Sequence, residues 1–301
     1  MPQQLSLYAS LPESELKITL QTLSSIAGMP PQPFLEHSLL WAPKHPYVPV
    51  LAAGQVNQIE QYRIRVSCDL ISLTEEEEED IEIEEKKENS NKQIPPHLAT
   101  DPDYAVKRAV LPYADISAHP ALSTRPWTFT VAELPEAGKL SVISQSLISV
   151  SPKVPAGDHT PFEFLDKLGY VFRTEYWTKG YQFVHGNVVV RIFRLCGFDA
   201  HAFKNELEQI REAEKNVQPP EAAVAAAVAA KNEILEGDFL RLLDATKRWT
   251  MVALINVESI TDLDAIARAT AELERFRADV AGLVDLELPE RNSFDTRIKR
   301  R

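Results

Sequence analysis

Several features that define common protein classes are scarce or missing in this chain of 301 residues. It has two cysteines, Cys68 and Cys196, which lie far apart and form no C-x-x-C pattern, so we expect buried, reduced thiols rather than a disulfide framework. No apolar run approaches the ~20 residues that cross a bilayer. No basic and apolar secretory signal is visible, so we expect a soluble, intracellular protein without a membrane partner.

Positive charge is also in short supply. Lysine and arginine number 32 against 44 aspartates and glutamates, which gives a formal net charge of −12. Proteins that hold nucleic acid across their surface need clustered basic side chains to neutralise phosphates. The composition therefore argues against direct, specific DNA binding.

The usual signatures of catalysis and cofactor binding are missing. The chain contains no Walker loop, no G-x-G-x-x-G motif and no G-x-S-x-G elbow, and its ten glycines leave little room for a phosphate-cradling loop. Its seven histidines are scattered, and none is spaced from another histidine or a cysteine as metal ligands are. We therefore expect no catalytic residues, no metal and no cofactor.

The clearest local pattern runs from Thr160 to Leu195. Thr160-Pro161-Phe162-Glu163 predicts a capped helix start, and Gly169 predicts its left-handed end. Alternating residues then predict a three-stranded antiparallel meander, with one turn at Lys179-Gly180 and another at residues 185–187.

Similar patterns elsewhere predict further strands joined by short turns. We expect a short edge strand at residues 5–8 and a capping-box helix after Ser10. Further strands are expected at 34–41, 61–73, 127–131, 142–150 and 249–257, and a last helix from Thr261 to Val280. Parallel sheets need helical crossovers, and few are available. The predicted fold class is α+β and mainly β: a many-stranded antiparallel barrel with flanking helices.

Two segments differ in composition from the rest of a single predicted barrel domain over residues 1–301. Residues 74–102 open on an unbroken acidic run, and such dense like charge predicts a disordered insertion. Residues 212–236 are rich in alanine, which favours helix but buries little, so we expect a helical insertion there.

One enzymatic alternative follows from a short motif. Glu82-x-Glu84-x-Lys86 matches the pattern with which triphosphate-tunnel enzymes hold a divalent metal and phosphate, so a metal-dependent triphosphate hydrolase is the alternative function. Such a tunnel also needs inward basic residues, for which the strand arginines are candidates: Arg63, Arg65, Arg173, Arg191 and Arg194. The motif nevertheless lies in a run dominated by glutamate, where chance matches abound, and a solvated acidic loop is the simpler interpretation.

Trp177 and Arg173 are the candidate partner-binding residues. They share one face of a predicted strand with Glu175, and an aromatic side chain beside arginine is typical of interface anchors. The alternative is a tryptophan covered by the protein's own loop.

The chain resembles the Mediator subunit 18 family of the fungal type. The resemblance rests on LGY at 168–170, KGYQFV at 179–184, GNVV at 186–189 and IF at 192–193, with looser support from residues 249–257, 282–286 and 289–297. It implies a barrel with triphosphate-tunnel-like architecture but without catalysis, in the nuclear head module of the Mediator coactivator. It also implies pairing with Mediator subunit 20, docking of the C-terminal helix of subunit 8, and contact with RNA polymerase II through the assembled complex.

Overall fold

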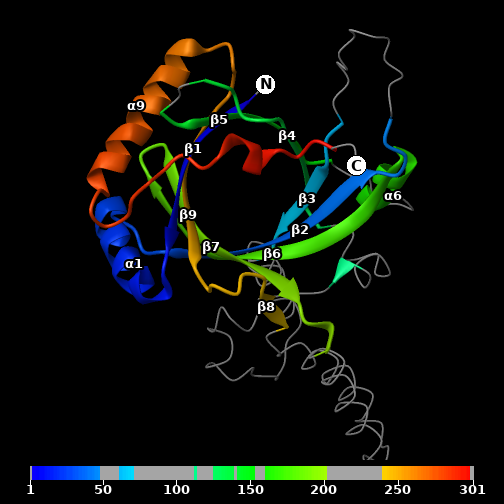
Figure 1. The fold of residues 1–301 in the computed structure, drawn as a ribbon, viewed down its shortest axis with the longest axis horizontal. Coiled ribbons are helices and arrows are strands. Elements are labelled where there is room, and N and C mark those ends of the chain that lie inside the picture. Colours follow the sequence, from blue (N-terminus) through cyan, green and yellow to red (C-terminus); the bar gives the residue numbers. More distant parts are fainter. Residues whose placement is uncertain are drawn as a thin grey trace, which may run out of the picture.

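The computed structural model describes residues 2–47, 61–70, 112–113, 125–138, 141–152, 160–201 and 239–298. Nine strands dominate this part of the chain, and three α-helices and a short 3-10 helix accompany them (Figure 1). The strands are β1 (Gln3–Leu11), β2 (Gln32–Pro43), β3 (Ile64–Asp69), β4 (Thr128–Ala132), β5 (Ile143–Val150), β6 (Tyr170–His185), β7 (Val188–Phe198), β8 (Leu240–Leu242) and β9 (Trp249–Val257). The helices are α1 (Glu13–Ala27), α6 (Pro161–Lys167), α9 (Leu263–Asp279) and η1 (Arg291–Phe294).

Eight of these strands form a closed antiparallel barrel. The order is β6-β2-β3-β4-β5-β1-β9-β7, and β7 pairs back with β6 to complete the ring, while β8 adds to β7 outside it. Closure gives each barrel strand a neighbour on both sides, so the ring leaves few unpaired backbone groups that could pair with another chain. The predicted fold class is confirmed.

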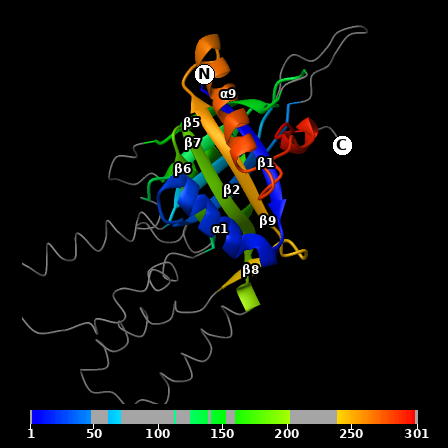
Figure 2. The same cartoon turned by 90° about the vertical axis from the view of Figure 1, so that its left-hand side faces the viewer.

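The helices pack on the outside of the ring, where they cover its apolar face (Figures 1 and 2). Leu23 of α1 and Leu273 and Phe276 of α9 are buried against outward residues of β1, β7 and β9. Phe162 and Leu165 of α6 join a second apolar cluster on β2, β3 and β6. Two separate apolar cores therefore lie between the barrel and its helices. The side chains on the opposite face of each strand point into the barrel.

Most of the predicted strands are confirmed, but β1 is not an edge strand. Its residues pair with β9 along the whole strand and with β5 from Gln3 to Ser6. The helix after it begins at Glu13 with Pro12 as its N-cap, and no side chain caps it, so the capping box predicted at Ser10 is wrong.

The predicted meander is a two-stranded hairpin. β6 runs unbroken through Lys179 and Gly180, because Gly180 pairs with Phe34 of β2 on one side and Phe193 of β7 on the other. A strand held between two neighbours has no freedom to turn, and Gly180 does not adopt a positive φ. This glycine marks close approach of two backbones, which is the other reason why strands contain glycine.

The helix before β6 follows the sequence closely. The Thr160 hydroxyl accepts a hydrogen bond from the Glu163 amide at 3.2 Å, and Pro161 occupies the first turn. Gly169 ends the helix with a φ of 79°. The predicted insertions at 74–102 and 212–236 lie outside the described residues. No described helix is long and apolar enough to cross a membrane.

Candidate functional site

The interior of the barrel carries many polar side chains. Strand register places these residues on the face opposite the helix-covered cores: Gln4, Ser6, Tyr8, Glu36, Ser38, Arg65, Ser67, Thr128, Thr130, Gln145, Ser149, Thr178, Gln182, Arg191 and Thr250. Alternation along each strand produces this arrangement, because successive side chains point to opposite faces. The inner face therefore carries polar residues among apolar ones such as Phe34, Val252 and Leu254, and its charged residues form the first candidate site.

One carboxylate, that of Glu36, lies close to two arginine side chains on the inner face of the barrel. Arg191 Nη2 lies 3.2 Å from Glu36 Oε2, and Arg65 Nη1 lies 4.0 Å from Glu36 Oε1. The Ser38 hydroxyl donates a further hydrogen bond to Glu36 Oε1 at 3.2 Å. The Arg191 guanidinium also stacks over the Phe34 ring, with 4.0 Å between its central carbon and the ring centroid. These contacts fix the acid and Arg191 in one place.

The chain's last described segment closes the barrel wall. We call residues 287–298 the C-terminal strap. Its Glu287 exchanges two backbone hydrogen bonds with Tyr8 of β1, and Arg297 bridges to Tyr62, just before β3. Phe294 packs on the Tyr8 ring with 5.1 Å between centroids. The strap, red in Figure 1, thus joins β1 to the chain leading into β3, and it meets β1 at Tyr8, beyond the Gln3–Ser6 stretch that pairs with β5.

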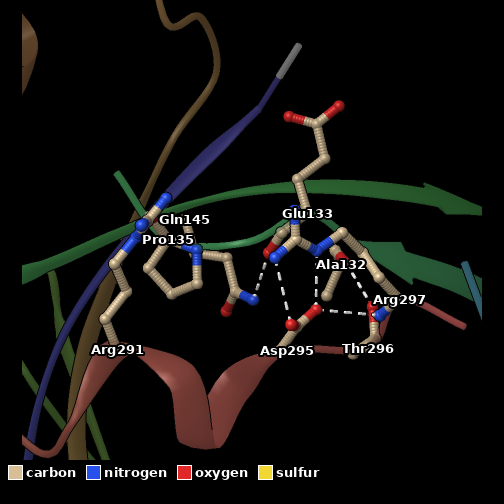
Figure 3. A network of polar contacts seen from close by, with 8 residues as sticks. All are labelled: Ala132, Glu133, Pro135, Gln145, Arg291, Asp295, Thr296 and Arg297. Carbon is tan, nitrogen blue, oxygen red and sulfur yellow. Dashed lines mark hydrogen bonds and ion pairs between the residues drawn. The ribbon is translucent and has the colours of Figure 1, made fainter. Parts of the chain in front are cut away.

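A polar network holds the strap to the β4–β5 hairpin (Figure 3). The Thr296 hydroxyl donates to the Ala132 carbonyl at 2.6 Å, and the Arg291 side chain donates to the Pro135 carbonyl. Within the strap, Arg297 donates two hydrogen bonds to Asp295, at 2.8 and 3.1 Å. Paired donors on a carboxylate give both strength and a fixed geometry. The strap is therefore a part of the wall and not a loose tail.

Trp177, predicted as a partly exposed interface anchor, is fully buried. Its ring stacks on His37 with 4.2 Å between centroids and an interplanar angle of 6°. The alternation that grouped Trp177 with Arg173 is interrupted by a register shift in the β2–β6 pairing at Arg173, and Trp177 pairs with the buried His37. Arg173 is exposed, and its role in partner binding stays a prediction.

His37 packs on Trp177 and also takes part in a hydrogen-bond chain with the Glu175 carboxylate and the Tyr113 backbone amide. Its Nε2 lies 3.0 Å from Glu175 Oε2, and the same oxygen accepts a hydrogen bond from the Tyr113 amide at 2.8 Å. Burial lowers the pKa of His37, although the hydrogen bond and the charge of Glu175 oppose this shift. The neutral imidazole therefore donates through Nε2, and its Nδ1 is buried without a hydrogen-bond partner.

This buried histidine predicts a loss of stability in acid. A histidine whose pKa is lower in the folded state takes up its proton more readily when unfolded. Its contribution is complete above the unfolded pKa of ~6.5 and declines below that pH, by at most about 1.4 kcal/mol per pH unit. We expect urea unfolding to show a steeper loss between pH 7.5 and 5.5 for the wild type than for His37→Phe, which keeps an aromatic ring over Trp177. If the free energy of unfolding fell equally with pH in the two proteins, His37 would not be the source of the acid sensitivity.

Cys68 pairs with His37 across β2 and β3, so the outer cluster contains a thiol, an imidazole and a carboxylate. Burial raises the pKa of Cys68 to about 12, so the thiol stays protonated near neutral pH. A nucleophilic cysteine needs the opposite shift and access to substrate. Cys68 and Cys196 are both buried and neither forms a disulfide, as the sequence predicts, and Cys68 lacks the properties of a nucleophile.

An apolar patch lies on the outer face of the β4–β5 hairpin. Direct cross-strand pairs join Phe129 to Val150 and Val131 to Ile148. Val150 is 55% exposed and Ile148 38% exposed. We call these four residues the β4–β5 patch. A second exposed apolar pair, Phe164 and Leu168, lies on and just after α6.

The structure brings together few of the residues that the enzymatic alternative requires. Glu82, Glu84 and Lys86 lie outside the described residues. Of the candidate arginines on named strands, Arg65 and Arg191 face inward, register places Arg194 on the outer face, and Arg173 lies at the register shift in the β2–β6 pairing. Within the described ranges, no group of three histidine, cysteine, aspartate or glutamate side chains could hold a metal ion.

The sequence analysis did not identify Glu36 or the strap as parts of a site. Glu36 is one of many glutamates, and only strand register shows that its neighbours are two arginines from other strands. For the strap, the resemblance of residues 289–297 to the family was the available signal, and it carried no structural assignment.

A closed antiparallel ring with helices outside and a C-terminal strap that joins β1 to the chain before β3 defines a closed β-barrel protein. The comparisons with known proteins agree on a narrower group. The family model described as "Med18 protein" matches residues 3–297. The chain therefore belongs to the Med18 family.

Relatives over the full length support this family. The chain is 35% identical over 297 residues to "Mediator of RNA polymerase II transcription subunit 18" of Yarrowia lipolytica, covering 99% of this chain and 100% of the relative. It is 24% identical to the Saccharomyces cerevisiae protein of the same name, covering 99% and 98%. A chain in the structure of the Schizosaccharomyces pombe Mediator head module shares the fold, with a TM-score of 0.56 and 14% identity over 94% of this chain and 97% of that chain.

Proposed function

We propose that this chain is a non-catalytic structural subunit of the Mediator coactivator complex in the nucleus. Its relatives' name and its full-length family match carry this proposal. The described residues support it, because burial keeps the Cys68 thiol protonated and Glu36 forms an ion pair with the inward Arg191. The finer assignments are that the chain pairs with Mediator subunit 20, binds the C-terminal helix of subunit 8, and communicates with RNA polymerase II through the assembled complex.

Affinity purification from nuclear extract tests this function. The tagged full-length chain is expected to recover Mediator head subunits in stoichiometric amounts, with subunits 20 and 8 among them. The same preparation, incubated with tripolyphosphate and Mg²⁺ or Mn²⁺, is expected to release no phosphate above the buffer rate. Recovery of the chain alone would contradict the proposal, and metal-dependent phosphate release would favour the enzymatic alternative.

We further propose that subunit 20 binds the β4–β5 patch. The two cross-strand pairs form a contiguous apolar surface on rigid barrel strands, and such surfaces are rare on monomers unless they meet a partner. The core of a stable interface is apolar and depleted of charge, which this surface satisfies.

Serine substitutions test this assignment. The double variant Ile148→Ser and Val150→Ser is expected to weaken binding to subunit 20 by at least about tenfold, since each lost side chain removes buried apolar area worth roughly 1–2 kcal/mol. The matched control is Phe164→Ser with Leu168→Ser, which removes two side chains of similar exposure elsewhere and should leave binding unchanged. Affinities are measured by titration calorimetry after circular dichroism shows that both variants are folded. If only the control variant lost binding, the proposal would be wrong and the interface with subunit 20 would lie at α6.

A further inference from the structure

The charged cluster inside the barrel suggests a role beyond assembly. Glu36 projects inward from β2, and its two arginine partners come from β3 and β7. Arg191 reaches Glu36 from beyond β6, the strand that lies between β7 and β2. Both carboxylate oxygens are occupied, Oε2 by Arg191 and Oε1 by Arg65 and the Ser38 hydroxyl.

Solvent reaches this cluster. The Arg65 side chain is 44% exposed, the Arg191 side chain 27% and Glu36 17%. A guanidinium group that is accessible to solvent and fixed in position can bind an oxyanion, because its planar N–H donors can contact two oxygens at once. Two such groups around one position would attract an anion with several oxygens.

Glu36 is the acid that both arginines approach, and Arg191 forms the shorter ion pair with it. A free anion would have to displace Glu36 and leave its charge without a partner in a partly buried place, which is costly. We propose that Glu36 is an internal counter-anion that closes the barrel interior to free polyphosphate, and that the position it fills is a latent site for anions of that class.

Removing the charge of Glu36 without changing its shape tests this proposal. Glu36→Gln keeps an oxygen that can accept from Ser38 but leaves Arg65 and Arg191 without their shared acid. Titration calorimetry of the full chain with sodium tripolyphosphate, at constant ionic strength, is expected to show at least tenfold tighter binding to Glu36→Gln than to the wild type. Bound ligand should also raise the Tm of the variant, since binding to the folded state alone stabilises it.

Matched variants separate a specific site from a general change of charge. Glu274→Gln removes the same charge from an exposed position on α9 and should bind no better than the wild type. Adding Arg191→Gln to Glu36→Gln should abolish the gain. Glu36→Met, an apolar replacement of similar length, provides the same comparison if the glutamine variant does not fold. Equal binding by the wild type and the Glu36 variants, or a gain that survives the loss of Arg191, would overturn the proposal. Neither result bears on assembly with subunit 20, so the two proposals fail separately.

Discussion

Replacing Trp177 with alanine is expected to lower the free energy of unfolding by about 3–5 kcal/mol. The side chain is fully buried, and it stacks flat on His37 within the outer cluster of β2, β3 and β6. The substitution removes a large apolar area and leaves a cavity that the surrounding rigid strands cannot fill. The indole Nε1 has no hydrogen-bond partner, so its removal breaks no hydrogen bond and the expected loss comes from packing alone. Urea unfolding followed by far-UV circular dichroism measures the change.

Arg173→Ala is the matched control for this substitution. Arg173 lies on the same strand but is exposed, so its removal should change the free energy of unfolding by no more than about 0.5 kcal/mol. If Trp177→Ala were as stable as the wild type and lost only its partners, Trp177 would be an interface residue, which is one of the two interpretations that the sequence left open. The burial of Trp177 predicts the reverse result.

The second large effect is expected for Gly180→Ala. A Cβ atom at this position would lie 2.0 Å from the Ile192 carbonyl oxygen and 2.7 Å from the Phe193 Cα. Both obstacles are backbone atoms of β7, so the β6–β7 pairing must move apart to admit a methyl group. Overpacking of this kind costs about 3 kcal/mol. Thermal and urea unfolding of the variant measure the loss.

Gly197→Ala provides the comparison. Its added Cβ would meet only the end of the Leu243 side chain, at 2.9 Å, and Leu243 is more than half exposed and can rotate away. We expect a change below about 1 kcal/mol there. Unfolded-chain entropy favours alanine at both sites alike, so equal effects at Gly180 and Gly197 would contradict the claim that the approach of β6 to β7 sets the cost.

The contrast between these glycines explains much of what the sequence could and could not predict. Local patterns were sufficient for α6, where Thr160, Pro161 and Gly169 each act within one turn of the helix. They were also sufficient for β9 and for the β4–β5 hairpin. At Gly180 the same reasoning failed, because a glycine in a turn and a glycine between two close strands have the same local sequence.

The candidate site was less predictable than the fold. Register decides which residues meet inside a barrel, and pairing of distant strands sets the register. Glu36, Arg65 and Arg191 come from three strands with up to 155 positions between them, and no local spacing connects them. Trp177 shows the same limit on the outer face, since its burial depends on His37 and Trp127 from other strands.

The central claim is that this chain acts through surfaces that it presents to other subunits. Co-expression with the subunit 20 homologue of the same organism, followed by size-exclusion chromatography with light scattering, tests it most directly. We expect a single peak with the mass of a 1:1 complex, and we expect this complex to persist on dilution to nanomolar concentration. Separate elution of the two chains at micromolar concentration, with both folded, would contradict it.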